Sequence, residues 1–211
     1  MSRASSFAGV ILAAGDSSRM GRDKALRPWP PPAAGQAPSS DTLLAAAIRS
    51  LSAATEFVLV VVGKNEEAVA PVIYAQGASL VINPDPGRGQ FSSLQVGLHE
   101  VLNRGRDAAM ITLVDCPPVS AATLQMLRDA FEAADQNIWA VVPEFSGKHG
   151  HPYLAGREMM EAFLRVPPAS IARDIEHAHQ KHVQYLRVED PLVASNINTP
   201  EEYAGLENLE N

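Results

Sequence analysis

The chain has 211 residues, of which 46% are hydrophobic and 19% are charged, as in an ordinary globular protein. A chain of this length is expected to fold as one domain, residues 1–211, with a core large enough for three layers. The formal net charge of −7 and the isoelectric point near 5.3 argue against a protein that coats nucleic acid, because that role needs a basic face.

The single cysteine, Cys116, leaves no partner for an internal disulfide and fits a reducing cytoplasm. The first seven residues carry no apolar signal core. No apolar run approaches the ~20 residues that a membrane-spanning helix needs. We therefore expect a cytoplasmic protein that binds neither nucleic acid nor a membrane.

An apolar run at residues 10–12 predicts a buried parallel strand. A turn-forming cluster at residues 15–18 follows it and leads to Arg19, Gly21 and Lys24. Small residues let backbone N–H groups approach a ligand, and arginine and lysine are the cations suited to phosphate. Nucleotides bind where such strands end, so this loop is a candidate phosphate site. The plain alternative is a turn with surface cations, and the loop matches neither the GK[ST] nor the GxGxxG pattern.

The stretch from residue 27 to residue 41 is rich in proline, serine and small residues, which predicts an irregular loop. We favour a surface insertion over a lid that stacks Trp29 on a substrate. The later strands are predicted at residues 57–62, 80–82, 108–114, 138–142 and 183–188. The later helices are predicted at residues 43–51 (capped by Asp41 or Thr42), from Asn65 (short or kinked at Pro71), from Ser92 or Ser93, from Ser120, at residues 171–180 (capped by Ser170) and after a capping box of Thr199, Pro200 and Glu202.

This alternation of strands and helices predicts βαβ units and a mainly parallel sheet with helices on both faces. Asp115 comes directly after a predicted strand, where metal ligands lie, although turn aspartates without a function are also common. His149 and His151 flank Gly150, but a zinc site usually needs three or more ligands and no cysteine is near. Local evidence alone leaves Ser92 and Ser93 as simple helix caps.

The segment LAAGDSSRMGRDK, residues 12–24, resembles the LAAGxSxRMGxxK signature of the MobA-like nucleotidyltransferases, most of all the molybdenum cofactor cytidylyltransferases. Three further stretches are similar to that family: NPDPGRGQFSSLQVGL at residues 83–98, LVDCPPVSAATLQML at residues 113–127, and the Gly-His-Pro segment at residues 150–152. The resemblance implies a three-layer Rossmann-like α/β nucleotidyltransferase fold with a mainly parallel sheet.

The resemblance also implies roles for individual residues. Arg19 would grip the triphosphate, Lys24 would stabilise charge at the reacting phosphate, and Asp115 would hold Mg²⁺; these three are the implied catalytic residues. His149, Gly150 and His151 would lie on the acceptor side. The implied nucleotide-binding residues are Leu12, Ala13, Ala14, Gly15, Ser17, Ser18, Arg19, Met20, Gly21, Lys24, Asn83, Gly89, Ser92 and Ser93.

Asn196 and Asn198 stand where the cytidylyl branch of the family carries Asp-x-Asp and the guanylyl branch carries Asn-x-Asn. By resemblance they would join Asp115 around Mg²⁺, which accepts neutral oxygen ligands. The asparagine pair favours guanosine, whereas Ala14 favours cytidine. The first motif, the Ser-Ser-Leu turn and the Gly-His-Pro segment are three matches to the cytidylyltransferases, whereas the asparagine pair is one match to the guanylyltransferases. We therefore favour CMP.

The implied reaction moves a nucleotidyl group, CMP in preference to GMP, from a nucleoside triphosphate to the phosphate of molybdopterin and releases pyrophosphate. A molybdoenzyme or its chaperone is the protein partner that the resemblance suggests. Three alternatives stay open: a guanylyltransferase on the same acceptor, a transferase for a sugar or polyol phosphate, and a non-catalytic nucleotide-binding protein. The retained Lys24, Arg19 and Asp115 speak against the last, because binding alone does not need all three.

Overall fold

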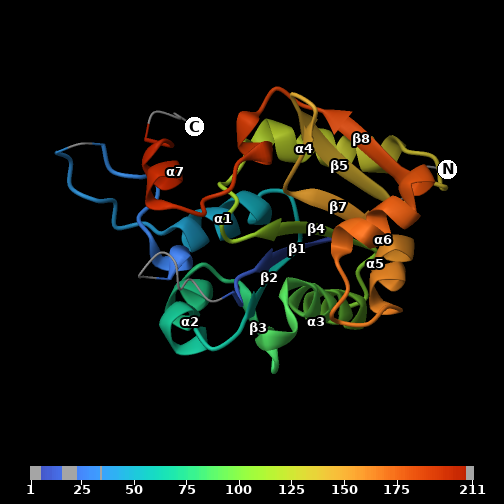
Figure 1. Ribbon diagram of the computed structural model, residues 1–211, viewed down its shortest axis with the longest axis horizontal. Coiled ribbons are helices and arrows are strands. Elements are labelled where there is room, and N and C mark those ends of the chain that lie inside the picture. The colour runs from blue at the N-terminus through green and yellow to red at the C-terminus, as the bar shows by residue number, and fades with distance from the viewer. Residues whose placement is uncertain (1–5, 16–22, 34, 208–211) are drawn as a thin grey trace.

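The computed structural model describes residues 6–15, 23–33 and 35–207 (Figure 1). An eight-stranded sheet runs through it in the order β3-β2-β1-β4-β7-β5-β6, and β8 pairs with β5. The strands are β1 (Phe7–Leu12), β2 (Phe57–Val62), β3 (Ser79–Ile82), β4 (Ala108–Leu113), β5 (Ala140–Phe145), β6 (Lys148–His149), β7 (Tyr153–Gly156) and β8 (Val183–Arg187).

The predicted mainly parallel sheet is confirmed. The contiguous strands β3, β2, β1 and β4 are parallel, as are β5 and β8. The short strand β7 is antiparallel to both of its neighbours, β4 and β5, and β6 is antiparallel to β5. Neither β6 nor β7 is predicted by the sequence, because so short a segment next to Gly-His-Pro carries no strand periodicity.

Helices cover both faces of the sheet, as expected for a three-layer fold (Figure 1). One face packs against α1 (Leu43–Ser52), α2 (Glu66–Ala75) and α4 (Ala121–Ala133). The other packs against α3 (Gln90–Asn103), α5 (Arg157–Leu164) and α6 (Ala172–Ala178), and the short α7 (Pro200–Ala204) follows near the end of the chain. No helix in the described ranges is long and apolar enough to cross a membrane.

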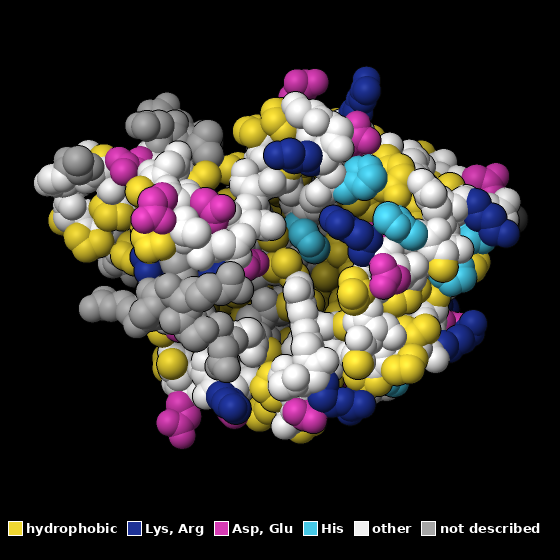
Figure 2. Space-filling model, viewed as in Figure 1, with side chains coloured by type: hydrophobic (Ala, Val, Ile, Leu, Met, Phe, Trp, Pro, Cys, Tyr) yellow, Lys and Arg dark blue, Asp and Glu magenta, His cyan; other side chains and the backbone are white. Residues whose placement is uncertain are grey.

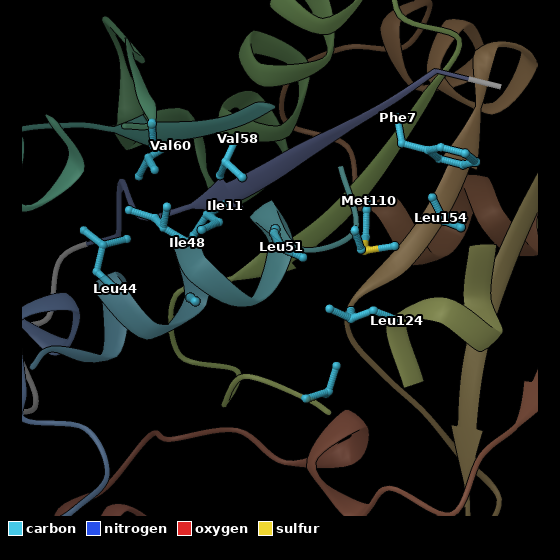
Figure 3. Packing of buried hydrophobic residues seen from close by; sticks show 14 of the residues in the cluster. Phe7, Ile11, Leu44, Ile48, Leu51, Val58, Val60, Met110, Leu124 and Leu154 are labelled. Carbon is cyan, nitrogen blue, oxygen red and sulfur yellow. The ribbon is translucent and has the colours of Figure 1, made fainter. Parts of the chain in front are cut away.

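Alternating strand side chains build the two halves of the core. Figure 3 shows Ile11 of β1 beside Leu44, Ile48 and Leu51 of α1, and all four are nearly or fully buried. On the other face the close approach of α3 depends on Gly97. A Cβ atom at Gly97 would lie 2.9 Å from Val10 Cγ1 and 3.0 Å from Val61 Cγ2. The glycine therefore lets α3 lie against the carboxyl-terminal halves of β1 and β2.

Three predicted helix starts are confirmed. The Thr42 hydroxyl accepts a hydrogen bond from Ala45 N at the start of α1, and Ser120 accepts one from Thr123 N at the start of α4. The capping box at Thr199 is present at the start of α7. Each cap satisfies a backbone N–H group that the first helical turn leaves without an intrahelical partner.

Two other predicted caps are wrong. Helix α3 begins at Gln90, and its N-cap is Gly89, whose φ of +100° suits glycine, so Ser92 and Ser93 lie inside the first turn. Helix α6 begins at Ala172 with Ile171 as N-cap, not Ser170.

Helix α2 runs through Pro71 to Ala75. Asn65 holds the predicted N-cap position of this helix but makes no capping hydrogen bond. Its amide instead donates to Ala13 O and to Asp23 Oδ2, at 3.0 and 2.7 Å. Asn65 therefore ties the residues that follow β1 to the turn before Lys24.

Trp29 is a structural residue and not a surface that stacks on substrate. It is 6% exposed and packs with Leu43, Ile197 and Tyr203, between α1 and α7. The Tyr203 hydroxyl donates a hydrogen bond to Pro28 O, which ties the stretch before residue 34 to the end of the chain. Trp29 lines neither of the cavities described below, so the lid interpretation is wrong for this side chain.

Candidate functional site

A cavity of about 230 Å³ opens where β1 and β4 end. We call it the donor cavity. Its walls include these residues that the sequence analysis singled out: Leu12, Ala14, Gly15, Lys24, Gly89, Ser93, Asp115 and Asn198. Pro86, Gln90, Leu113 and Val114 also line it and were not predicted, because apolar and amide side chains in a loop carry no recognisable signal. The carboxyl ends of parallel strands thus bring separate motifs together, as in other open α/β sheets.

Lys24 lies at the centre of the polar wall. Its Nζ donates hydrogen bonds to Asp115 Oδ2 at 3.2 Å and to Asn198 Oδ1 at 3.3 Å. The lysine begins a short 3-10 helix, Lys24–Leu26, and Asp23 caps this helix by accepting from Ala25 N. The Lys24 and Asp115 side chains are 15% and 25% exposed, so solvent screens this pair only in part.

Residues 196–198, which we call the closing segment, are held against the end of β4 by a backbone hydrogen bond. Ile197 N donates to Asp115 O at 2.8 Å, and Glu202 accepts from Asn198 N at 2.6 Å. The structure therefore brings Asp115 and Asn198 together but places Asn196 differently. The Cys116 thiol donates to Asn196 Oδ1 at 3.1 Å, and burial, with a smaller contribution from the Asp115 charge, raises the pKa of Cys116 to about 12. Cys116 is therefore a protonated packing residue.

The oxygens of Asp115 and Asn198 suit a hard divalent cation such as Mg²⁺ or Mn²⁺. Both side chains reach the same Nζ atom, so both oxygens face one small volume. Among the described residues no group of three or more His, Cys, Asp or Glu side chains could hold a metal ion. The donor set therefore fits a divalent cation that takes its remaining ligands from water and from substrate phosphates.

Of the polar side chains of Asn83, Ser92 and Ser93, that of Ser93 lines the donor cavity. The Asn83 amide is 3% exposed and donates to both Ser92 Oγ and Ser93 Oγ, each at 2.9 Å. Asn83 and Ser92 lie outside the cavity wall and border a separate surface hollow. Ala13 is likewise buried in the core behind the cavity. Asn83 thus holds the Ser93 hydroxyl in position without lining the donor cavity itself.

Ser17, Ser18, Arg19, Met20 and Gly21 lie outside the described residues, so the contacts of the predicted triphosphate loop are not part of the described geometry. The loop enters after Gly15 and leaves before Asp23. Both of its ends are anchored to the same network, because Asn65 bonds Asp23 and Ala13.

A second cavity, of about 460 Å³, adjoins the first, and we call it the acceptor cavity. Leu12, Gly89, Gln90 and Leu113 line both. Figure 2 shows a hollow on the face that carries α6, with hydrophobic side chains on its floor and histidine, cationic and acidic side chains around its mouth. A volume of a few hundred Å³ with an apolar floor and few polar groups is typical of a small-molecule site.

All three predicted acceptor-side residues line this cavity. The His149 ring stacks on Tyr185 with 3.9 Å between ring centres. His151 Nδ1 lies 3.4 Å from Ile111 O, and burial lowers the pKa of His151, which favours its neutral form. Gly150 has no room for a side chain, because a Cβ atom would lie 1.7 Å from Val193 O.

Helix α6 and two strands supply acceptor-cavity residues that the sequence analysis missed. Arg173, Glu176 and His177 come from α6, and Tyr153 and Tyr185 come from β7 and β8. The spacing of three and four residues along α6 places these three side chains on one helical face. This spacing is the feature of the sequence that could have indicated a polar helix face at the site. Burial raises the pKa of Glu176 to about 7, and this perturbation marks the residue as a site candidate.

Comparison with known proteins identifies the family of this chain. The family described as MobA-like NTP transferase domain matches residues 9–183. A probable molybdenum cofactor guanylyltransferase of Rhodopirellula baltica is 27% identical over 91% of this chain and 87% of its own length. The molybdenum cofactor cytidylyltransferase of Escherichia coli is 24% identical over 92% of each chain.

Among solved structures, Rv0371c of Mycobacterium tuberculosis superposes with a TM-score of 0.79 at 25% identity, covering 97% of this chain and all of the other. Its complex with manganese superposes with a TM-score of 0.76 at 23% identity over the same shares of the two chains. The family match agrees with the α/β fold and with the position of the sequence motifs at the ends of the strands. The chain belongs to the MobA-like NTP transferase family and is a nucleotidyltransferase.

Proposed function

We propose that this protein transfers a nucleotidyl group, CMP in preference to GMP, from a nucleoside triphosphate to the phosphate of the molybdopterin cofactor. The observation that carries the proposal is the Lys24, Asp115 and Asn198 cluster, which lies in a donor cavity directly adjoining a larger acceptor cavity. Two curated relatives that span most of this chain are named for nucleotidyl transfer to the molybdenum cofactor.

In the proposed reaction an oxygen of the acceptor phosphate attacks the α-phosphorus of the triphosphate in line. A new P–O bond forms, the bond to the β-phosphate oxygen breaks, and pyrophosphate leaves with the electron pair. This chemistry depends on positioning and on charge neutralisation more than on an acid or a base. The Lys24 ammonium supplies a fixed positive charge, and Gly89 and Ser93 line the wall beside it.

Asp115 and Asn198 are the residues that would hold Mg²⁺. A bound magnesium ion would neutralise phosphate charge. The manganese complex of the M. tuberculosis protein shows that one protein of this fold takes a divalent cation. Asn196, which accepts from Cys116, would act through the conformation of the closing segment.

The preference for CMP rests on Ala14. It lines the donor cavity within the Leu-Ala-Ala-Gly segment, which in this family lies against the base. The asparagine pair, which favours guanosine, lies instead against Lys24 and Cys116. The two curated relatives differ in base and are similarly distant, so they do not decide the question.

Pyrophosphate release tests the proposal. The purified protein is incubated with Mg²⁺, molybdopterin and each of CTP, GTP, ATP and UTP, and each reaction is repeated without acceptor. We expect acceptor-dependent release that is fastest with CTP. Faster release with GTP would overturn the base assignment, and release with a sugar or polyol phosphate but not with molybdopterin would overturn the acceptor. Binding of nucleotide without release would identify a binding protein.

A further inference from the structure

Glu176 supplies a carboxyl group to the wall of the acceptor cavity, among apolar, aromatic, histidine and arginine side chains. It lies on α6 and is partly exposed, and desolvation in the cavity wall raises its pKa to about 7. Burial, with a smaller contribution from the Glu176 charge, raises the pKa of Tyr153 and of Tyr185, and both phenols line the same cavity. Arg173 acts in the opposite direction and lowers the pKa of Glu176.

No hydrogen bond or ion pair within the described ranges reaches the Glu176 carboxyl group, although Arg173 influences it electrostatically. Its oxygens are therefore available to N–H groups of a ligand, and such donors would offset the cost of removing the carboxylate from water when a ligand fills the cavity. Nearby, the stacked rings of His149 and Tyr185 form part of the same cavity wall. The cavity therefore combines a flat aromatic surface with a carboxyl group that has room for hydrogen-bond donors.

We propose that Glu176 recognises the 2-amino-4-oxopyrimidine edge of a bicyclic heterocycle in the acceptor. The two carboxylate oxygens would accept parallel hydrogen bonds from the ring N–H and the exocyclic amino group, the same fork geometry that joins arginine to a carboxylate. This inference rests on the proposed function, because molybdopterin is the acceptor that carries such an edge.

The arrangement of the two cavities sets the direction of the acceptor. Glu176 lines the acceptor cavity but not the donor cavity, and the two cavities meet at Gly89 and Gln90. A ligand whose heterocycle lies at α6 would extend its phosphate toward that boundary, where the donor phosphates would lie. Guanine carries the same hydrogen-bonding edge, and the position of Glu176 favours the acceptor over the base of GTP.

Binding of free pterin and of lumazine distinguishes these possibilities, because lumazine replaces the 2-amino group of pterin by an oxygen. Both are titrated by fluorescence into the unmodified protein, with GMP as a third ligand. We expect pterin to bind at least tenfold tighter than lumazine. Equal affinity for the two would overturn the inference without requiring any variant to fold.

Glu176→Gln keeps the shape of the side chain and removes the second acceptor oxygen. We expect it to abolish the preference for pterin while leaving GMP binding unchanged. The matched control is Asp174→Asn, which removes one charge from the same helix at an exposed position outside the acceptor cavity. It should bind pterin as the unmodified protein does. A retained pterin preference in Glu176→Gln would overturn the inference, and a loss of GMP binding would mean that Glu176 reads the donor base.

This test is independent of catalysis. A Glu176-dependent preference for pterin in a protein that releases no pyrophosphate would refute the proposed function and leave the inference standing. Acceptor-dependent pyrophosphate release with an unchanged KM for the acceptor in Glu176→Gln would refute the inference and leave the function standing.

Discussion

The Nζ atom of Lys24 lies 3.2 Å from Oδ2 of Asp115, although 91 residues separate them in the chain. The relationship arises because β1 and β4 are adjacent parallel strands that end at the same edge of the sheet. A cation and a carboxylate at this edge can hold a polyphosphate and its metal ion together. The Lys24 ammonium and a bound metal ion would therefore compete for the side-chain oxygens of Asp115 and Asn198.

Replacing Lys24 by methionine should tighten Mn²⁺ binding several-fold in the absence of nucleotide. The change removes a positive charge next to Asp115 Oδ2 and Asn198 Oδ1, so a divalent cation no longer competes with it. Electron paramagnetic resonance measures the free Mn²⁺ directly. Lys24→Arg, which keeps the charge, is the control and should bind Mn²⁺ as the unmodified protein does. Weaker binding in Lys24→Met would mean that the lysine organises the metal ligands instead of competing with the ion.

Ser93→Ala should raise the KM for the nucleoside triphosphate more than Ser92→Ala does. Both hydroxyls accept a hydrogen bond from Asn83 at 2.9 Å, and the Ser92 hydroxyl also donates to Gly89 O at 2.7 Å, so Ser92→Ala loses more structural contacts than Ser93→Ala does. Only Ser93 of the two lines the donor cavity. Steady-state kinetics with varied nucleotide gives the two KM values. An equal or larger effect of Ser92→Ala would show that both serines contact the nucleotide, as the family resemblance implies.

Gly150→Ala should destabilise the protein strongly. A Cβ atom there would lie 1.7 Å from Val193 O, which forces the backbone apart, and overpacking of this severity costs about 3 kcal/mol. For a chain of this size the melting temperature falls by about 2–4 °C per kcal/mol. Gly205→Ala is the matched control, because its Cβ atom would meet nothing closer than 3.5 Å and its φ is −60°. Similar melting temperatures for the two variants would contradict the packing described for Gly150.

Glu176→Gln should gain stability relative to the unmodified protein as the pH rises. The pKa of Glu176 is raised from 4.5 to about 7, so its contribution is fully present below pH 4.5 and is lost as the pH rises through 7. Glutamine does not titrate. The difference in melting temperature should therefore grow between pH 4.5 and pH 7 and then level off.

Other titratable groups line the same cavity and are common to both proteins in this comparison: Arg88, His149, His151, Tyr153, Arg173, His177 and Tyr185. Their own titrations cancel to first order in the difference. Asp174→Asn provides the control, because this exposed position lies outside the acceptor cavity. A difference that stays constant with pH would contradict the burial of the Glu176 carboxyl group.

The sequence predicts the first half of the sheet well, because the runs at β1, β2 and β4 are apolar and bounded by turn residues. It misses the start of α3, because the backbone conformation of Gly89 decides it and not the serines that follow. It also misses β7, whose place between β4 and β5 is a tertiary property.

Some residues of the candidate site can be predicted from the sequence, and others depend on tertiary contacts. Motifs reveal Lys24, Asp115 and Gly150, because their residue types recur at fixed positions beside strand ends. Glu176 is one charged residue on a short polar helix, and its place in the site depends on residues of β7 and β8 that line the same cavity. The supporting role of Asn83 also depends on tertiary contacts, because the asparagine is recognisable in a motif but its partners are not.

The turnover of Lys24→Ala with CTP, Mg²⁺ and molybdopterin tests the central claim most directly. Removing a cation that stabilises the transferring phosphate should lower kcat by about 10- to 1000-fold. The melting temperature should change little, because the side chain lines a cavity instead of filling the core. A loss of this size in a folded variant would place nucleotidyl transfer at the Lys24 and Asp115 pair. An unchanged kcat would contradict the mechanism proposed for this site.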